Sequence, residues 1–316
     1  MNKDLRYYWQ RFGTLLIFVL LIIIMSILSP KYFFTVDNFV QILLQSAITI
    51  LIAVGEFFAI LIAGIDLSVG SVLGLTGMVT ALLLSKSVNI YLAILIGGIL
   101  LGALLGAING SLVVFTGLHP FIITLGGLTI FRGLTLMISD ARPIYNIPPE
   151  FSRSISGTIL SIPVPIIIAI IVAIIFAFVT RKTKLGRNIY ALGGNEEAAW
   201  LSGINVKMHK VLVFMFSGVC AGIAGVVMTA RMGAAEPLAG NGYELFAIAS
   251  AIIGGTSFFG GKGKIFGVVM GALIIGLINN ALNILNVQTY YQQIFMGLLI
   301  IGSVSLDKFL SKRSSK

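Results

Sequence analysis

The chain has 316 residues, of which 58% are hydrophobic and only 10% are charged, and its mean hydropathy is +1.05. These side chains cannot cover the surface of a water-soluble protein of this size with polar groups, which excludes that class. The formal net charge of +10 would suit nucleic-acid binding, so the positions of the 21 basic residues along the chain must decide.

Ten apolar stretches are candidates for membrane-spanning helices, since a bilayer core requires about 20 apolar residues per span. Basic residues precede the first stretch, as in a signal peptide, but no small-residue cleavage site follows, so we expect this stretch to be retained. The eighth stretch is short and ends in glycines, which is typical of a partial span. The ten stretches are 13–29, 39–63, 67–84, 90–115, 120–138, 163–179, 211–230, 244–256, 265–285 and 291–306.

The basic residues follow the positive-inside rule if both termini are cytoplasmic. With ten alternating spans, 15 Lys and Arg residues fall inside and 5 outside, and Arg132 falls within a span. This asymmetry explains the high charge without nucleic acid. The inner set includes the terminal residues Lys3, Arg6, Arg11, Lys308, Lys312, Arg313 and Lys316.

Two polar connections interrupt this single membrane domain of residues 1–316. The outer one, 139–162, is rich in proline and is expected to be a loop between the two membrane halves. The inner one, 180–210, holds six basic residues and one short candidate helix. Asn195 can cap the start of that helix, where Glu196 and Glu197 suit the helix dipole, and Gly203 can end it in a left-handed turn.

A weak internal repeat relates two of the stretches. Gly98 and Gly102 are spaced as Gly267 and Gly271 are, and both pairs are followed by Ala-Leu. In the topology above the two stretches run in opposite directions, so the repeat would be inverted, as in many transporters. The alternative is that this spacing only allows close packing between membrane helices.

Enzymatic motifs are nearly absent from the sequence. His119 and His209 lie far apart, and the single cysteine, Cys220, lies in an apolar run, where a small buried side chain is the simplest reading. The glycine-rich segment 254–264 lacks the spacing of a Walker A loop, so we expect no ATP site on this chain.

Polar residues inside predicted spans are costly and therefore are candidate functional groups. Glu56 either pairs with Arg132, is protonated, or lines a substrate path. Asp66, within the Gly64–Ser71 segment that contains Ser68, either caps the following helix or lines the path. Arg132 is expected to be a buried counter-charge. Three asparagines are expected to bridge helices by hydrogen bonds, namely Asn109, Asn279 and Asn280.

Several long segments together resemble the permease subunits of bacterial ABC sugar importers of the ribose, xylose and allose type, within the branched-chain-amino-acid/ribose permease superfamily. They are GIDLSVGS at 64–71, HPFIITLGGLTIFRGL at 119–134, LGRNIYALGGNEEAAWLSGI at 185–204, YELFAIASAIIGGTSFFGGKGKIFG at 243–267 and LINNALNIL at 277–285. They follow one another in the family's order along essentially the whole chain.

The resemblance implies a permease homodimer in the bacterial cytoplasmic (inner) membrane, a cytosolic ATPase with two nucleotide-binding cassettes, and an extracytoplasmic sugar-binding protein. ATP and Mg²⁺ would bind to the ATPase, and this chain would bind no cofactor. The segment from Asn195 through Glu196, Glu197, Ala198, Ala199 and Trp200 to Gly203 matches the family's ATPase-coupling region. Trp200 stands where many relatives have arginine, and Glu56 where an uncharged residue is usual.

The sequence therefore predicts an all-α polytopic membrane protein of about ten helices, which is a transport subunit and not an enzyme. It would move a monosaccharide, a pentose or an allose-like hexose, by alternating access driven by the separate ATPase. The alternative is a proton-coupled secondary sugar transporter that uses Glu56, Asp66 and Arg132. The sequence does not identify the sugar, since specificity would lie on the binding protein.

Overall fold

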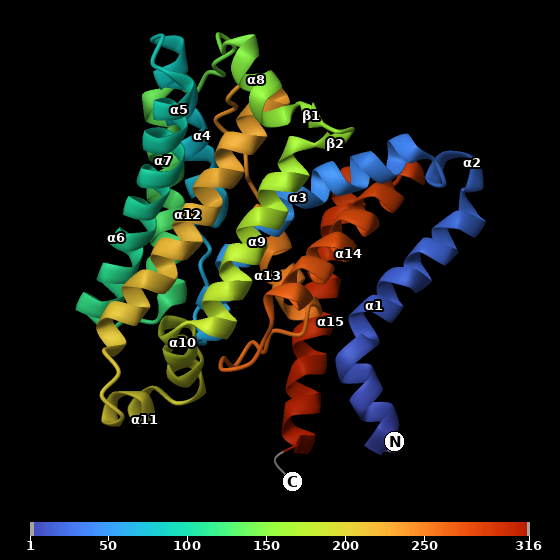
Figure 1. Cartoon of the computed structure of the whole chain (residues 1–316), viewed down its shortest axis with the longest axis vertical. Coiled ribbons are helices and arrows are strands. Elements are labelled where there is room, and N and C mark those ends of the chain that lie inside the picture. Colours follow the sequence, from blue (N-terminus) through green and yellow to red (C-terminus); the bar gives the residue numbers. More distant parts are fainter. Residues whose placement is uncertain (1–2, 315–316) are drawn as a thin grey trace.

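The computed structural model describes residues 3–314, with side chains described for 13–305 and Lys308. The terminal residues Lys3, Arg6, Arg11, Lys312, Arg313 and Lys316, which were counted above, have side chains outside this part. Nearly all regular structure is helical (Figure 1). The elements are α1 (Lys3–Leu28), α2 (Pro30–Phe33), α3 (Val36–Leu61), α4 (Val69–Ser85), α5 (Ile90–Ala93), the π-helix η1 (Ile94–Leu100), α6 (Leu101–Thr116), α7 (Pro120–Ile138), α8 (Pro149–Ser156), β1 (Thr158–Ile159), β2 (Ile162–Pro163), α9 (Val164–Lys182), α10 (Lys184–Gly194), α11 (Glu196–Leu201), α12 (Val206–Met232), α13 (Tyr243–Ile253), α14 (Ile265–Ile284) and α15 (Thr289–Ser314).

Six helices in the described chain are long and apolar enough to cross a membrane, namely α3, the continuous helix of α5, η1 and α6, and α7, α9, α12 and α14. Shorter apolar helices lie at Gly13–Leu28, Val69–Ser85 and Tyr243–Ile253. Each predicted stretch coincides with one helix, and the 11-residue α13 has the length of a partial span. The chain is a multi-pass membrane protein.

The two ends of the molecule carry different elements. Figure 1 shows α8 and the β1–β2 hairpin at one end, and α10 and α11 at the other. The start of α1 and the end of α15 lie at the same end as α10 and α11. The termini and the charged 180–210 connection thus share one side of the molecule.

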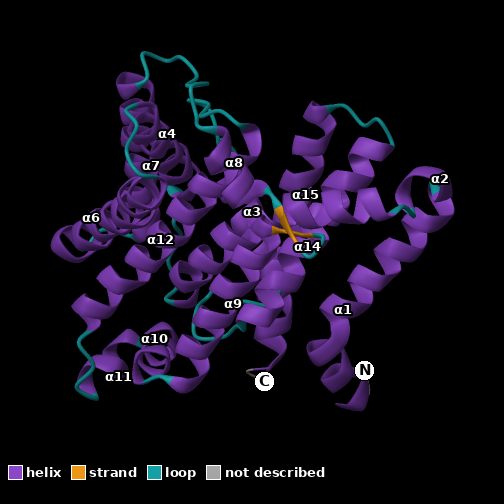
Figure 2. Ribbon diagram, turned by 45° about the horizontal axis from the view of Figure 1, so that its top comes forward, coloured by secondary structure: helices purple, strands orange, loops and turns teal. Residues whose placement is uncertain are grey.

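The core forms around α3. In its most apolar 18-residue window, 83% of the residues are buried, whereas the corresponding share for α7 is 22%. A helix that is apolar on all sides suits such a central position, and α7 presents most of its surface outward. Figure 2 likewise shows α3 in the middle of the bundle, flanked by α9, α12 and α14.

Small residues allow α6 and α12 to approach each other closely. A Cβ built on Gly102 would clash with the Gly218 carbonyl oxygen, and one on Gly222 would clash with the Gly98 carbonyl oxygen. Close packing, as proposed for the Gly98–Gly102 spacing, is therefore present. Cys220 lies on α12 as a fully buried thiol, as predicted.

The helix that leads into this contact contains seven residues of π-helix, η1, which the sequence reading did not predict. Gly97 and Gly98 lie within η1, and a Cβ on Gly97 would collide with the Thr80 side chain and backbone of α4. The wide turn thus lies where the helix packs tightly between two neighbours.

Helix packing in the two halves of the chain follows one pattern. Of the helices in the first half, α3 packs on α14, α6 packs on α12, and α4 packs on α7. Exchanging α3 with α12, α4 with α13, α6 with α14 and α7 with α15 reproduces these pairs, because α12 packs on α6 and α13 on α15. This exchange symmetry is what two internal repeats would produce.

The connection 139–162 differs from the predicted loop. Residues Pro149–Ser156 form α8, which packs against α12 and α9 and buries Phe151 completely. Antiparallel pairing of β1 with β2 follows. Pro149 causes no conflict, because proline is well tolerated in the first turn of a helix.

Candidate functional site

The six-residue helix α11 is capped at both ends by the predicted residues. Asn195 Oδ1 accepts a hydrogen bond of 2.9 Å from the Ala198 amide. At the other end Gly203 has φ +78°, and the Ile204 amide donates 3.1 Å back to the Ala199 carbonyl. These bonds satisfy backbone groups that a free helix end leaves unpaired, so the short helix is defined locally.

Side chains from neighbouring helices hold α11 in place. Lys210 Nζ of α12 lies 2.7 Å from Glu196 Oε1. The buried His209 contacts the Asn205 carbonyl through Nδ1 at 2.7 Å and Asn188 Nδ2 of α10 through Nε2 at 3.1 Å. A single neutral tautomer, with the proton on Nδ1, satisfies both contacts. Helices α10, α11 and α12 therefore form one connected unit.

The outer face of α11 is unusually apolar for an exposed surface. Trp200 is 65% exposed and Leu201 is 72% exposed, while Ala199 on the opposite face is buried. Glu197 is exposed beside them. An aromatic and an aliphatic side chain that project together from a polar segment are typical of a contact surface.

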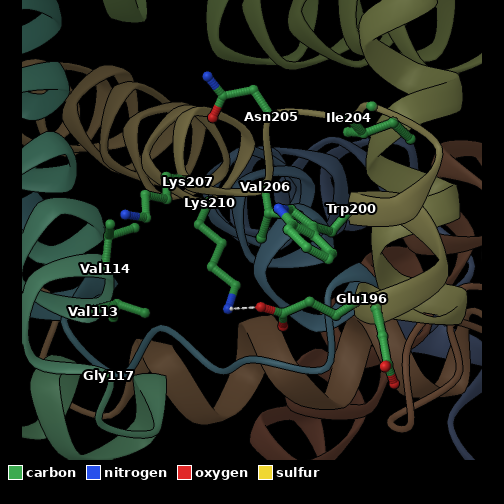
Figure 3. Close-up of a pocket in the computed structure, with 12 residues that line it drawn as sticks. Val113, Val114, Gly117, Glu196, Trp200, Ile204, Asn205, Val206, Lys207 and Lys210 are labelled. Carbon is green, nitrogen blue, oxygen red and sulfur yellow. Dashed lines mark hydrogen bonds and ion pairs between the residues drawn. The ribbon is translucent and has the colours of Figure 1, made fainter.

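An open groove of about 850 Å³ separates α11 from the end of α6 (Figure 3). Figure 3 shows the Trp200 ring beside Val206, with Lys207 and Lys210 reaching from α12. The groove combines an apolar wall with charged rims. Its lining consists of Val113, Val114, Gly117, Glu196, Glu197, Trp200, Gly203, Ile204, Asn205, Val206, Lys207 and Lys210.

Helix α10 joins this unit to the membrane core. The Tyr190 hydroxyl donates to the Gly263 carbonyl at 2.8 Å, and burial raises the pKa of Tyr190, which keeps the donor protonated. A Cβ on Gly193 would clash with the Leu61 carbonyl oxygen, which already accepts the Gly261 amide at 2.8 Å. The glycine-rich segment thus serves as a docking loop between α10 and the end of α3.

A buried polar cluster lies one turn above that contact on α3. Glu56 Oε1 accepts the Asp66 amide at 3.1 Å, and Asp66 Oδ1 accepts both the amide and the hydroxyl of Ser68, at 3.0 and 2.6 Å. Asn109 of α6 donates to the Ser68 hydroxyl at 2.8 Å. All four side chains are at most 1% exposed. The structure therefore unites four residues that the sequence analysis named separately.

The cluster corrects one expected role. Asp66 is not the N-cap of α4, because Ser68 occupies that position and makes no side-chain cap bond. Asp66 instead accepts from the backbone two residues ahead, as in an Asx-turn. The turn brings the chain back toward Glu56 before α4 starts at Val69.

Most of the chain is similar to known proteins. Residues 38–304 match the family described as the permease component of branched-chain amino acid transport systems. The chain belongs to this permease family. It is 60% identical over 305 residues to the D-allose transport system permease protein AlsC of Escherichia coli K12, covering 96% of this chain and 94% of that protein.

Two further relatives cover almost as much of the permease. The ribose import permease protein RbsC of Haemophilus influenzae is 46% identical over 299 residues, 93% of this chain and 92% of its own. The L-arabinose transport system permease protein AraH of Escherichia coli K12 is 34% identical over 304 residues, 96% and 92%. No solved structure matches.

One reading of the sequence predicted that Arg132 pairs with Glu56, but in this permease the two side chains do not pair. Arg132 Nη1 donates to the carbonyls of Pro237 at 2.7 Å and Ala239 at 2.8 Å, and Nη2 donates to that of Gly70 at 3.3 Å. The pairing prediction was wrong because irregular backbone on two other segments supplies neutral acceptors for the guanidinium.

The permease places Asn279 and Asn280 differently. Asn279 is half-buried and lies outside the Glu56 cluster, whereas Asn280 is buried and donates 2.7 Å to Asn38 Oδ1 of α3. Of the two, Asn280 thus bridges helices, as expected. Glu244 was missed as a site residue, although it interacts electrostatically with both Arg132 and Glu56. An acidic residue at the start of a short apolar helix was the available signal.

Proposed function

We propose that this chain is the permease subunit of an ABC importer that moves a monosaccharide across the bacterial cytoplasmic membrane. Family membership and relatives named for allose, ribose and arabinose transport support this function. The higher identity to the allose protein favours an allose-like hexose over a pentose. The chain would act as a transport subunit without catalytic chemistry of its own.

The observation that carries the proposal is the exposed helix α11. Its Trp200–Leu201 tip lies at one end of the molecule, within the cationic 180–210 connection and beside the groove. An apolar tip with charged neighbours suits insertion into a protein partner. We assign this partner as a cytosolic ATPase with two nucleotide-binding cassettes, which would hold the ATP and Mg²⁺.

Motion of α11 would reach the membrane core through contacts already described. Asn188 joins α10 to α12, and Gly193 lies against Leu61 at the end of α3, near Glu56. Ten spans, cytoplasmic termini, inverted repeats and a permease homodimer complete the proposal. Rigid-body movement of the repeats across the dimer would alternate access for sugar delivered by an extracytoplasmic binding protein.

Reconstitution in proteoliposomes tests this function. Uptake of radiolabelled allose should require ATP, the ATPase and loaded binding protein, and should persist when an ionophore removes the proton gradient. The proton-coupled alternative draws on the adjacency of Glu56 and Asp66. It predicts uptake by the permease alone that collapses with the ionophore, and that result would overturn the proposed function.

A further inference from the structure

Two chain reversals meet inside the permease. The first, 62–68, connects α3 to α4, and the second, 233–242, connects α12 to the short α13. The start of α4, just after the first reversal, touches the second reversal, because a Cβ on Gly70 would clash with the Gly240 carbonyl oxygen and a Cβ on Gly240 would clash with that of Gly70. Gly240 also has φ +76°, which favours glycine. Figure 1 places α13 between the two ends of the molecule.

Arg132 links the start of α4 to the second reversal. Its guanidinium donates to Gly70 at the start of α4 and to Pro237 and Ala239 before α13. Irregular backbone at membrane depth is tolerated only where protein buries it or where it borders a water-filled cavity. Arg132 satisfies three backbone carbonyls where the second reversal packs against protein. The side of the reversal that faces away from Arg132 therefore indicates whether it borders lipid, protein or water.

The exposed side of this segment is mixed. Asn241 is exposed between the exposed Leu238 and Leu245, and Tyr243 and Glu244 are half-buried. The Glu244 carboxyl lies beside Gly70, since a Cβ there would be 2.5 Å from Oε2, and it interacts electrostatically with Arg132. Carboxylate and amide groups at this depth are too costly to face lipid. Asn241, Tyr243 and Glu244 therefore suit a polar space rather than lipid.

We propose that Asn241, Tyr243 and Glu244 form a contact point for the sugar on its way through the permease, with Arg132 as a positioning residue. The inference rests on the proposed function and extends it to a place on the chain. An amide and a carboxylate can each bond to sugar hydroxyls, and the tyrosine adds a ring and a hydroxyl. Because Arg132 offsets the charge of Glu244, the point suits a neutral polyhydroxylated ligand.

Cysteine accessibility tests the polar space without measuring transport. In a Cys220→Ser background, Asn241→Cys is compared with Leu104→Cys, which replaces a 56% exposed side chain on the outward face of α6. A water-soluble thiol reagent should modify Asn241→Cys more than about 10-fold faster, because thiolate formation requires water. Equal, slow modification of both variants in the nucleotide-free and ATP-bound transporter would overturn the proposal.

Sugar contact is tested in the reconstituted transporter with its ATPase and binding protein. Glu244→Gln and Asn241→Ala should each lower the sugar moved per ATP hydrolysed by about 10-fold, as expected for lost polar contacts, and should change the ratio of allose to ribose uptake. ATP hydrolysis stimulated by the loaded binding protein should stay within about 2-fold of wild type, since this coupling involves other residues. Glu236→Gln, in the same connection, is the matched control and should behave as wild type.

The outcomes separate this inference from the proposed function. If wild-type protein lacks ATP-dependent sugar uptake, the proposed function fails. If wild-type uptake is normal and both variants retain its efficiency and sugar preference, the contact point is wrong while the function stands.

Discussion

Helix α11 and the turn 62–68 are both short polar breaks between apolar helices, yet they are held in opposite ways. Caps from within its own segment define α11, whose Trp200 and Leu201 project outward. In the turn Asp66 and Ser68 are buried, and they bond to Glu56 and Asn109, which lie outside the turn. One segment is built to present a surface, and the other to stay fixed.

The difference bears on how a shift of α11 would act on the centre of the molecule. The capping bonds of α11 lie inside its own segment, so a shift of the helix would keep them and would strain its ion pair with Lys210 of α12. Movement of the turn would break bonds to α3 and α6 together. Helix α10 lies between them, since it is joined to α12 through Asn188 and packed against Leu61. Variants in each part should therefore have distinct effects.

The largest effect is expected from Gly203→Pro. Proline requires a negative φ, whereas Gly203 has φ +78°, so the turn after α11 should be lost at a cost of about 3 kcal/mol. Uptake driven by ATP should disappear while the protein still inserts into the membrane, as judged by yield and detergent gel filtration. Gly203→Asn, which tolerates this conformation, is the control. Normal coupling in Gly203→Pro would contradict the role of α11.

Gly193→Ala should disturb the link between the two regions. The added methyl would clash with the Leu61 carbonyl, and such overpacking costs about 1–3 kcal/mol. We expect ATP hydrolysis by the assembled transporter to continue with little uptake. Gly194→Ala is the matched control, because its Cβ would meet no atom within 4 Å. Equal uptake by the two variants would remove this junction from the coupling route.

Trp200→Ala should weaken docking of the ATPase. Buried aromatic residues at interfaces contribute about 2 kcal/mol or more, so the dissociation constant should rise by at least about 10-fold. Titration of labelled ATPase onto permease in nanodiscs measures this change, and Trp200→Phe should lose less. Unchanged affinity of the alanine variant would show that the exposed tip serves another purpose.

Glu56→Leu and Glu56→Gln separate the role of Glu56 as a hydrogen-bond acceptor for the buried turn from the role of its charge. Leucine removes the acceptor of the Asp66 amide, which should cost about 1–3 kcal/mol, whereas glutamine keeps an acceptor oxygen. Thermal unfolding in detergent should therefore distinguish the two variants. Wild-type uptake and sugar preference in Glu56→Gln would exclude a role for the Glu56 charge in transport.

Lys210→Ala is expected to have the smallest effect. Its bond to Glu196 is partly exposed to solvent, with the side chains 23% and 57% exposed, and such pairs contribute about 0.2–1 kcal/mol. The midpoint of thermal unfolding in detergent should change little. Docking of the ATPase should depend less on salt concentration. A large loss of stability would mean that α11 depends on tertiary support more than its caps indicate.

Sequence patterns predicted those features that residues close together in the sequence determine. The apolar stretches became helices, and Asn195 and Gly203 became caps, because those signals lie within a few residues of their partners. Partners far along the chain were not predictable. Arg132 bonds to carbonyls more than 100 positions away, at Pro237 and Ala239, which become acceptors only because that backbone is irregular.

The π-helix η1 has a consequence for how this chain tolerates length changes. Each residue of an α-helix advances the direction of a side chain by about 100°. An ordinary α-helix would complete nearly the same turns with one residue fewer, so η1 takes up an extra residue while the helix on either side keeps its direction. Deleting one residue from Ile94–Leu100 should therefore leave the contact of Gly102 with Gly218 in place and shift mainly the residues of η1 itself, such as Gly97 against Thr80. The wide turn thus allows a one-residue change in length between two glycine contacts on one helix.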